Sequence, residues 1–315
     1  MSRTGEHALV MYVTIHFSHF PAVPERAFIL VMSEKIAVIT GSSSGFGLLT
    51  AVEMAAAGYR VVATMRNLER RKILEDALQQ RNLSTKVDVR QLDITDTTAI
   101  PGVIDKIVAD YGRIDVLVNN AGFAMAGFLE DVTLDELRRQ FETNFFGHVA
   151  VTKAALPVMR KQRSGHIIMV TSIGGRCAAP VIGSYSASKY ALEGWSESLR
   201  IEMQPVGVQV VLVEPGAYKT DIWDRNSQIS PMTFDPSSPN AARAKRFSDY
   251  ALKQVHKRDA REVAQLILRI AQNPRPKLRY VAGSDARIQL FLKTVLPWRR
   301  YERIIAKTMK IDRAD

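Results

Sequence analysis

The chain has 315 residues, 46% of them hydrophobic, and a formal net charge of +11. Its one cysteine, Cys177, excludes an internal disulfide framework and fits a reducing, cytoplasmic compartment. The apolar runs stay well short of the ~20 residues that a transmembrane helix needs, so the composition favours a globular protein with a sizeable core.

Residues 1–31 read as an addition to the domain that follows. Their apolar stretch from Ala8 to Phe17 is broken by polar residues and is followed by no convincing small-residue cleavage site, which disfavours a signal peptide. Met32 then leads directly into the first predicted strand. We expect Met32 to be the natural start and the upstream segment to be disordered or not native.

From Lys35 onward, short apolar runs alternate with amphipathic stretches. The predicted strands are Ile36–Ile39, Arg60–Thr64, Val87–Leu92, Ile114–Val118, His166–Val170 and Val208–Val213. Helical spacing fills the intervals near 46–57, 68–80, 97–110, 134–162 and 184–204. Continuously apolar strands separated by helices indicate a doubly wound α/β fold around a parallel sheet. Gly58, Gly112, Gly165 and Gly207 stand where a helix should end, as C-cap glycines do.

The turn between the first strand and the first helix is rich in glycine, with the sequence TGSSSGFG from Thr40 to Gly47. Glycines let the backbone approach a pyrophosphate closely, and the following helix N-terminus supplies N–H donors. A plain turn uses the same residues, but the position after a buried strand favours dinucleotide binding.

A tyrosine and a lysine stand four residues apart in the run from Tyr185 to Lys189, with Ser172 thirteen positions upstream. On a helix, such residues share a face. A phenol titrates near ~10, and a neighbouring ammonium is expected to lower the pKa of Tyr185 into the range of general acid–base chemistry. Taken alone, the pattern equally fits an amphipathic helix with a solvated lysine.

Together, the glycine-rich turn, the run Asn119-Asn120-Ala121-Gly122, Ser172 and Tyr185-x-x-x-Lys189 resemble the short-chain dehydrogenase/reductase family. The resemblance covers roughly residues 34–225. Three residues separate the first two glycines of the turn, as in the compact branch of the family. The stretches 61–67 and 144–147 are similar to reductases of steroids, retinoids and other lipophilic carbonyls.

The resemblance implies a single Rossmann-type domain over 32–285 with a substrate lid at about 217–256. A basic C-terminal extension over 286–315 follows this domain. It also implies a homo-oligomer, paired through the helix near 134–162 and the helix that carries Tyr185. The substrate would be a small molecule with a carbonyl or alcohol group.

The resemblance also assigns the catalytic roles. Tyr185 would donate a proton to the substrate oxygen, and Ser172 would hydrogen-bond the same atom. Lys189 would contact the nicotinamide ribose and hold down the pKa of Tyr185. Asn144 matches the asparagine that positions a water in the proton relay; the alternative is a buried asparagine that bridges two backbone segments.

Cofactor choice depends on the end of the second strand. No acidic residue, which would bind a ribose 2′-hydroxyl, lies between Arg60 and Asn67. Arg66 instead suits a 2′-phosphate, with Ser42 as a second donor, so NADP(H) is favoured over NAD(H). The alternative is that Arg66 is an ordinary solvated cation.

The other cofactor contacts follow from the resemblance. The full expected set is Gly41, Ser42, Ser44, Gly45, Phe46, Gly47, Arg66, Asp93, Ile94, Asn120, Gly122, Tyr185, Lys189, Pro215, Gly216 and Thr220. Asp93 and Ile94 resemble the pair that contacts adenine, although Asp93 could instead be a helix N-cap. Asn120 and Gly122 are either cofactor-facing or strand-stabilising.

Three further residues invite functional interpretations. His148 and His166 are isolated, with no partner at ligand spacing, so structural roles are favoured and no metal site is expected. Cys177 follows Ser172 in a loop that could line the pocket, and a small buried filler is the favoured role.

The positive charge is concentrated at the C-terminal end of the chain. Residues 241–315 carry 19 Lys/Arg and 7 Asp/Glu, a balance of +12, whereas residues 1–240 carry 24 and 25. Beyond a predicted helix over 259–272 and strand over 278–282, residues 289–301 mix apolar, aromatic and basic side chains. These could lie on a membrane surface, but packing on the substrate side of their own domain is favoured. Nothing beyond charge suggests nucleic acid.

Two functions follow. The leading prediction is an NADP(H)-dependent oxidoreductase that interconverts a ketone or aldehyde and an alcohol, with a lipophilic substrate. The alternative is a cofactor-sensing or interaction protein on the same fold that uses the basic C-terminal region. The intact set of Asn144, Ser172, Tyr185 and Lys189 argues against the alternative.

Overall fold

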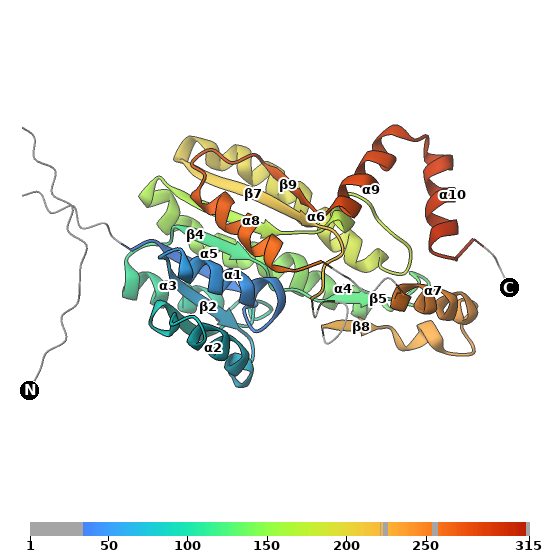
Figure 1. Ribbon diagram of the computed structural model, residues 1–315, viewed down its shortest axis with the longest axis horizontal. Helices are drawn as coiled ribbons and strands as arrows, with labels where there is room; N and C mark the ends of the chain where they lie inside the picture. Colours follow the sequence, from blue (N-terminus) through green and yellow to red (C-terminus); the bar gives the residue numbers. More distant parts are fainter. Residues whose placement is uncertain (1–33, 221, 223–225, 254–257, 313–315) are drawn as a thin grey trace, which may run out of the picture. The chain divides into compact units, whose positions relative to one another are not determined.

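A seven-stranded parallel sheet lies at the centre of the described chain (Figure 1). The computed structural model describes residues 34–220, 222, 226–253 and 258–312, so the predicted N-terminal extension lies outside the described residues. The strands of the sheet are β1 (Ile36–Thr40), β2 (Arg60–Met65), β3 (Val87–Gln91), β4 (Val116–Asn119), β6 (Gly165–Val170), β7 (Val208–Pro215) and β9 (Arg279–Ala282). All six predicted strands are present, as is the strand predicted near residue 280, which confirms the doubly wound parallel sheet.

The strand order places the candidate site at the carboxyl edge of the sheet. The order is β3-β2-β1-β4-β6-β7-β9, and every neighbouring pair is parallel. The direction of winding reverses between β1 and β4. Ligands of open α/β sheets bind in the crevice that such a reversal leaves at the carboxyl ends of the strands.

Helices cover both faces of the sheet. Their bounds are α1 (Gly45–Ala56), α2 (Lys72–Gln79), α3 (Ile100–Tyr111), α4 (Leu134–Phe141), α5 (Gly147–Gln162), α6 (Gly183–Met203), α7 (Ala241–Lys253), α8 (Arg261–Gln272), α9 (Ser284–Val295) and α10 (Trp298–Thr308). Side chains of α1, α2 and α8 join one apolar core, and those of α3, α5 and α6 join the other. The sheet is therefore buried on both faces, which explains its continuously apolar strands.

The helix predicted over 134–162 is interrupted. Thr133 and Glu136 form a capping box that begins α4, and a π-helical turn over Glu142–Phe146 separates α4 from α5. A π turn inserts an extra residue into the helix and so changes where the following side chains point. Asn144 lies in this turn.

Three of the four predicted C-cap glycines follow a helix end with the expected positive φ, Gly58 at +90°, Gly112 at +73° and Gly207 at +78°. The prediction for Gly165 is wrong. Arg163 is the C-cap of α5, with a left-handed φ of 53°, and Gly165 opens β6 instead. A Cβ on Gly165 would lie 3.2 Å from the side chain of Met159, so close packing on α5 favours glycine there.

The segment 217–256 is more regular than its sequence suggests. It contains the short strand β8 (Ser227–Ile229), which pairs in parallel with β5 (Ala124–Ala126), and the helix α7. This pairing holds β8 against the chain that follows β4. Phe128, Val181 and Ala244 of α7 form a small apolar cluster at this end of the molecule.

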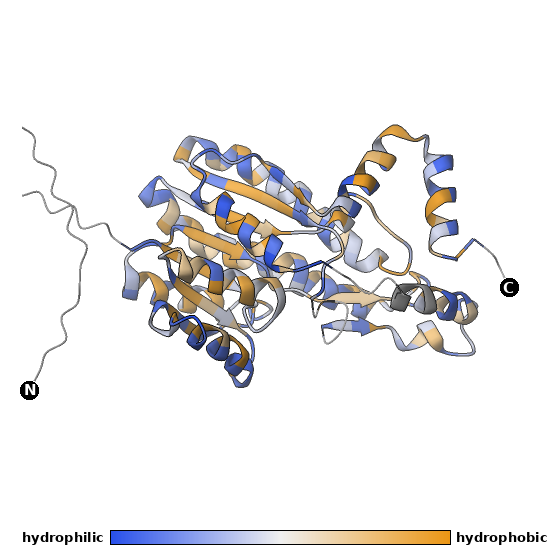
Figure 2. Cartoon of the chain, in the orientation of Figure 1, coloured by the Kyte–Doolittle hydropathy of each residue, from blue (hydrophilic) through white to orange (hydrophobic). Residues whose placement is uncertain are grey.

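The basic C-terminal region forms two helices, α9 and α10. Figure 2 shows bands of apolar and polar residues along both of them. Among the described residues, no helix combines the length and the apolar character that crossing a bilayer requires.

Candidate functional site

Strand β6 and helix α6 bring Ser172 and Tyr185 together. Ser172 follows β6 and caps a short 3-10 helix, where its Oγ accepts a hydrogen bond from Gly174 N at 3.0 Å. A Cβ built on Gly174 would lie 3.3 Å from Ser172 Oγ and 3.3 Å from Tyr185 Cε1. The Ser172 hydroxyl and the Tyr185 ring therefore lie on either side of Gly174, and a side chain at this position would press against both.

Tyr185 is buried, with 3% of its surface exposed. This burial raises the pKa of Tyr185 to about 12, and a hydrogen bond with Ser172 opposes only part of the effect. The predicted lowering of this pKa is therefore wrong for the structure described. Burial disfavours the phenolate more than the neighbouring polar groups stabilise it.

Lys189 lies one turn farther along α6 and is also buried. Its ammonium donates a hydrogen bond to Val170 O at 2.9 Å and lies 5.8 Å from the centre of the Tyr185 ring. Burial lowers the pKa of Lys189 to about 8, and the nearby Glu193 carboxylate opposes that shift. The helix thus places the two side chains on one face, as their spacing predicts.

A buried charge cluster lies behind Lys189. Glu193, on the next turn of α6, pairs with Arg279 of β9 at 3.0 Å. Arg279 also pairs with Glu214 of β7 at 3.0 Å, and Glu214 pairs with Arg176 at 3.2 Å. Burial raises the pKa of Glu193 to about 7. Tyr185, Lys189 and Glu193 continue the same four-residue spacing, but no pattern in the sequence predicts the pairing of Glu193 with Arg279.

Asn144 bridges the backbone of a neighbouring segment. It is fully buried, its Oδ1 accepts from Phe123 N at 3.2 Å, and its Nδ2 donates to Phe123 O at 3.0 Å. A Cβ on Gly122 would lie 3.1 Å from the same Oδ1. Asn144 is thus buried and bound to the backbone of one other segment, and its role in a proton relay stays a prediction.

Both histidines have structural partners. His148 Nε2 lies 2.6 Å from Ala121 O, and His166 Nε2 lies 2.8 Å from Asn273 O. Complete burial, followed by the charge of Lys189, lowers the pKa of His148 to about 3. In the part of the chain that the structure describes, no group of three or more His, Cys, Asp or Glu side chains is arranged to hold a metal ion.

The glycine-rich turn has the geometry that its sequence suggests. Gly41 and Gly45 have φ values of +70° and +55°. A Cβ on Gly47 would lie 2.3 Å from Gly41 O, and a Cβ on Gly41 would lie 2.7 Å from Ala121 Cα. The backbone therefore packs at distances that only glycine allows.

The N-terminus of α1 opens onto this turn. Ser44 is the N-cap residue of α1, and its side chain makes no capping hydrogen bond. Asn120 Nδ2 donates to the carbonyl oxygens of Thr40 and Gly41, at 2.9 and 3.1 Å, and so holds the turn in place. These contacts confirm the strand-stabilising alternative for Asn120. The cradle fits the phosphates of a dinucleotide, which helix N-termini and close backbone approach favour.

Ser42 points the wrong way for a cofactor contact. Its side chain is fully buried, with Oγ donating to Ile39 O at 3.0 Å, and its backbone N donates to Thr64 O at 2.9 Å. The prediction that Ser42 adds a hydrogen bond to a 2′-phosphate is therefore wrong. The hydroxyl instead provides a hydrogen-bond donor for the buried carbonyl of Ile39 near the end of β1.

Arg66 is exposed immediately beyond β2. Because Thr64 pairs with Thr40 and accepts from Ser42 N, the end of β2 lies beside the glycine-rich turn. Arg66 follows Thr64 by two residues. Its side chain is therefore near enough to the turn to contact part of a cofactor whose phosphates the turn holds. Between Arg60, the first residue of β2, and Asn67, the only charged side chain is that of Arg66.

Asp93, which follows β3, does not cap a helix. Asp93 Oδ1 accepts from Thr95 N at 3.0 Å, and α3 begins only at Ile100. The N-cap alternative for Asp93 is therefore wrong; the carboxylate closes a local turn instead. The Ile94 side chain is buried in the core formed with α3 and α5.

The chain after β7 returns to the glycine-rich turn. Thr220 Cβ would lie 3.6 Å from a Cβ on Gly45, so the two loops are in contact. Gly216 N, directly after Pro215, donates to Ala282 O at 2.8 Å. The Phe46 ring packs edge to face on Tyr218, with ring centres 5.8 Å apart. Both loops therefore border the crevice at the reversal of strand order.

Cys177 is 1% exposed, and burial raises the pKa of its thiol. The prediction of a small buried filler is confirmed.

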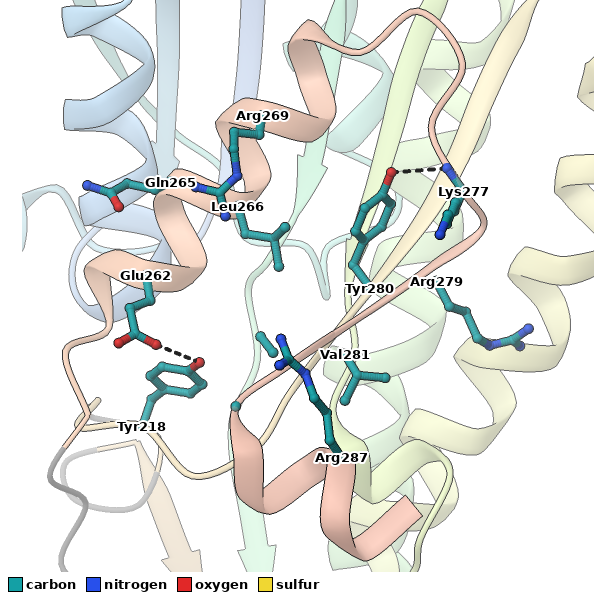
Figure 3. A pocket seen from close by; sticks show the side chains of 12 residues that line it. Tyr218, Glu262, Gln265, Leu266, Arg269, Lys277, Arg279, Tyr280, Val281 and Arg287 are labelled. Atoms are coloured by element: carbon teal, nitrogen blue, oxygen red, sulfur yellow. Dashed lines mark hydrogen bonds between the residues drawn. The ribbon is translucent and has the colours of Figure 1, made fainter. Parts of the chain in front are cut away.

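A separate cleft of about 620 Å³ lies between α8 and β9 (Figure 3). It is lined by Arg269, Lys277, Arg287 and the hydrogen-bonded pair Tyr218 and Glu262. None of the expected catalytic residues lines this cleft.

Comparison with known proteins agrees with this arrangement. A family model described as short chain dehydrogenase matches residues 35–230. The uncharacterized oxidoreductase YusZ of Bacillus subtilis is 42% identical over 282 residues, covering 88% of this chain and 99% of the relative. A 3-ketodihydrosphingosine reductase of Bacteroides thetaiotaomicron is 42% identical over 202 residues, covering 64% of this chain and 70% of that protein. A short-chain dehydrogenase structure from Streptomyces avermitilis superimposes with a TM-score of 0.73 at 34% identity, over 88% of this chain and 98% of that one.

Proposed function

The chain belongs to the short-chain dehydrogenase family, and we propose that it is an NADP(H)-dependent oxidoreductase acting on a lipophilic ketone, aldehyde or alcohol. Tyr185 is the proposed general acid and base. The observation that supports the proposal most is the contact of Ser172 and Tyr185 across Gly174, with Lys189 one turn away. Two hydroxyl donors then converge where charge develops on a substrate oxygen.

The state of Tyr185 suits proton donation. Because its pKa is raised to about 12, the phenol is protonated near neutral pH and can give its proton to a carbonyl oxygen. Ser172 Oγ donates to the same oxygen, while its own acceptor side is held by Gly174 N. A bound nicotinamide supplies the hydride chemistry that this family performs. Lys189, held by Val170 O, keeps a positive charge beside the phenol.

The glycine-rich turn and Arg66 are the proposed holders of the cofactor. Gly41 and Gly47 allow the close backbone packing that shapes the turn at the start of α1, where phosphates would be held. Arg66 offers an exposed guanidinium beside that turn. The planar guanidinium can donate two hydrogen bonds to a 2′-phosphate. This is the basis for preferring NADP(H).

Apolar side chains lie at the start of α6, the helix that carries Tyr185, and they support an apolar substrate. Val181, four residues before it, holds a φ of +67° and its carbonyl accepts from Gly127 N at 2.7 Å. A β-branched residue in the left-handed conformation destabilises the fold by about 1–3 kcal/mol. The packing of Val181 against Phe128 offsets this conformational strain. Leu129, 68% exposed, touches Gly183 at the start of α6. The relative named as a 3-ketodihydrosphingosine reductase supports a long-chain carbonyl as one substrate class.

The test is oxidation of NADPH with a panel of ketones and aldehydes of increasing chain length. We expect turnover that rises with chain length, and a loss of roughly 10²–10⁴-fold in Tyr185→Phe without loss of NADPH binding. Tyr111→Phe is the matched control, because that phenol donates to Asp88 on a distant part of the sheet. NADPH binding with no turnover on any carbonyl would instead indicate a cofactor-sensing protein.

A further inference from the structure

Large apolar side chains lie exposed along α9 and at the start of α10. The exposed fractions are 58% for Ile288, 63% for Phe291, 52% for Val295 and 63% for Trp298. The first three are spaced by three and four residues, so they share one face of α9. We call these four residues the apolar stripe. Figure 2 shows apolar bands on both α9 and α10.

Cations accompany the apolar stripe. Arg287 lies on α9, and Arg299, Arg300 and Arg303 lie on α10, all of them exposed. Between residues 284 and 308 the chain has six Lys/Arg and two Asp/Glu. A short helix with large apolar side chains and a cationic flank is the pattern that lies in the interface of an anionic bilayer.

We propose that α9 and the start of α10 form a docking surface for anionic phospholipid membranes. The apolar stripe enters the boundary between headgroups and acyl chains, and Arg299 and Arg300 contact lipid phosphates. The sequence alone favoured packing of this region on its own domain. The structure divides the region: some side chains pack inward, and the apolar stripe does not.

The inward side chains connect the docking surface to the candidate site. Lys293 of α9 donates to Tyr190 Oη at 2.6 Å and to the carbonyl of Arg176. Tyr301 of α10 is buried, and its side chain faces the Cys177 thiol. Arg176 and Cys177 belong to the loop that follows Ser172, and Tyr190 follows Lys189. The inward side of the two helices therefore contacts the elements that border the reacting groups, and the apolar stripe faces away from them.

Charge decides between a membrane and a second copy of the chain. A symmetric dimer through this face would gather the exposed arginines of both copies in one interface, and the repulsion between these like charges is unfavourable. An anionic bilayer has the complementary charge and accepts Phe and Trp side chains at its surface. The membrane is therefore the better occupant.

The experiment is vesicle flotation of the full chain. Vesicles of phosphatidylcholine alone are compared with vesicles that contain about 30 mol% phosphatidylglycerol, at low and high salt. We expect binding only to the anionic vesicles, weakened by salt. The double variant Phe291→Ser/Trp298→Ser and the charge variant Arg299→Glu/Arg300→Glu should each reduce the bound fraction roughly ten-fold or more.

Ile201→Ser is the matched control, because Ile201 is 72% exposed on α6 and away from the apolar stripe. It should leave flotation unchanged, and all variants should keep the thermal midpoint of the parent because the mutated side chains are exposed. Absence of flotation at low salt overturns the proposal. Equal binding by the variants, or a dimer in sedimentation that Phe291→Ser/Trp298→Ser dissociates, overturns it as well.

Discussion

The ammonium of Lys189 donates a hydrogen bond to the carbonyl oxygen of Val170 over 2.9 Å and so ties helix α6 to the end of strand β6. Both residues are buried. Ser172 follows Val170 by two residues, and Tyr185 precedes Lys189 by one helical turn. The bond therefore sets the position of the phenol relative to the serine hydroxyl. A hydrogen bond from a charged donor contributes about 1.5–3 kcal/mol in such a setting.

Lys189→Met keeps most of the side-chain volume and removes both the charge and this hydrogen bond. We expect turnover to fall at least roughly 10²-fold and the free energy of unfolding to drop by about 1–3 kcal/mol, because Val170 O loses its donor. Urea unfolding and NADPH oxidation measure the two effects. Lys153→Met, at an exposed position of α5, is the control. Unchanged turnover in Lys189→Met would remove the lysine from the proposed mechanism.

Arg66→Glu tests the cofactor preference. The variant places a carboxylate where NAD-binding folds bind a ribose 2′-hydroxyl and where a 2′-phosphate would be repelled. We expect kcat/KM with NADPH to fall by roughly 10–100-fold, and the value with NADH to hold or rise. Arg139→Glu makes the same charge change on α4 and should leave the ratio unaltered. A parent enzyme that already prefers NADH contradicts the assignment.

Gly47→Ala tests the packing of the glycine-rich turn. The added Cβ would lie 2.3 Å from Gly41 O and 2.5 Å from Asn120 Nδ2, so the backbone of the turn has to shift. We expect a loss of about 1–3 kcal/mol in the free energy of unfolding and weaker NADPH binding. Gly194→Ala, in α6 with open space around it, should instead stabilise the chain by up to about 1 kcal/mol. Equal effects of the two substitutions would show that the close approach carries no energetic weight.

His148→Gln tests the buried imidazole through the pH dependence of stability. The pKa of His148 is lowered from 6.5 to about 3 in the folded chain. Below pH 6.5 the unfolded chain therefore binds a proton that the folded chain does not. Stability from this group is complete above pH 6.5 and is lost as the pH falls toward 3.

In the parent chain this loss should amount to about 2 kcal/mol between pH 6.5 and 5.0, and in His148→Gln it should be absent. Chemical unfolding at pH 7.5 and 5.0 measures it. The other titrating groups are common to both chains, so they cancel in the comparison. Parallel pH profiles for parent and variant are the contrary result.

Features that depend on residues close together in the sequence could be predicted from the sequence. The four-residue spacing of Tyr185 and Lys189 puts them on one helical face in any fold. Gly41 and Gly45 adopt positive φ because the turn needs it. Where two residue types serve equally, the prediction failed: Arg163, not Gly165, ends α5 in a left-handed conformation.

Contacts between distant segments could not be predicted in the same way. Glu193, Glu214 and Arg279 meet from three elements, and Thr220 meets Gly45, only because the strand order places those elements side by side. Ser42 turns inward because the end of β1 offers it a carbonyl. These are properties of the packed sheet, and no spacing along the chain encodes them.

By itself, the amino-acid sequence determined the alternation of strands and helices, the parallel sheet and the residues gathered at its carboxyl edge, because hydrophobic periodicity and turn chemistry act over short distances. The tertiary structure decided the protonation of those residues. The same burial that assembles the site raises the pKa of Tyr185 to about 12 and lowers that of Lys189 to about 8. It also decided which C-terminal side chains pack inward and which stay exposed. Desolvation depends on the whole packed surroundings of a group, so only the folded chain specifies it.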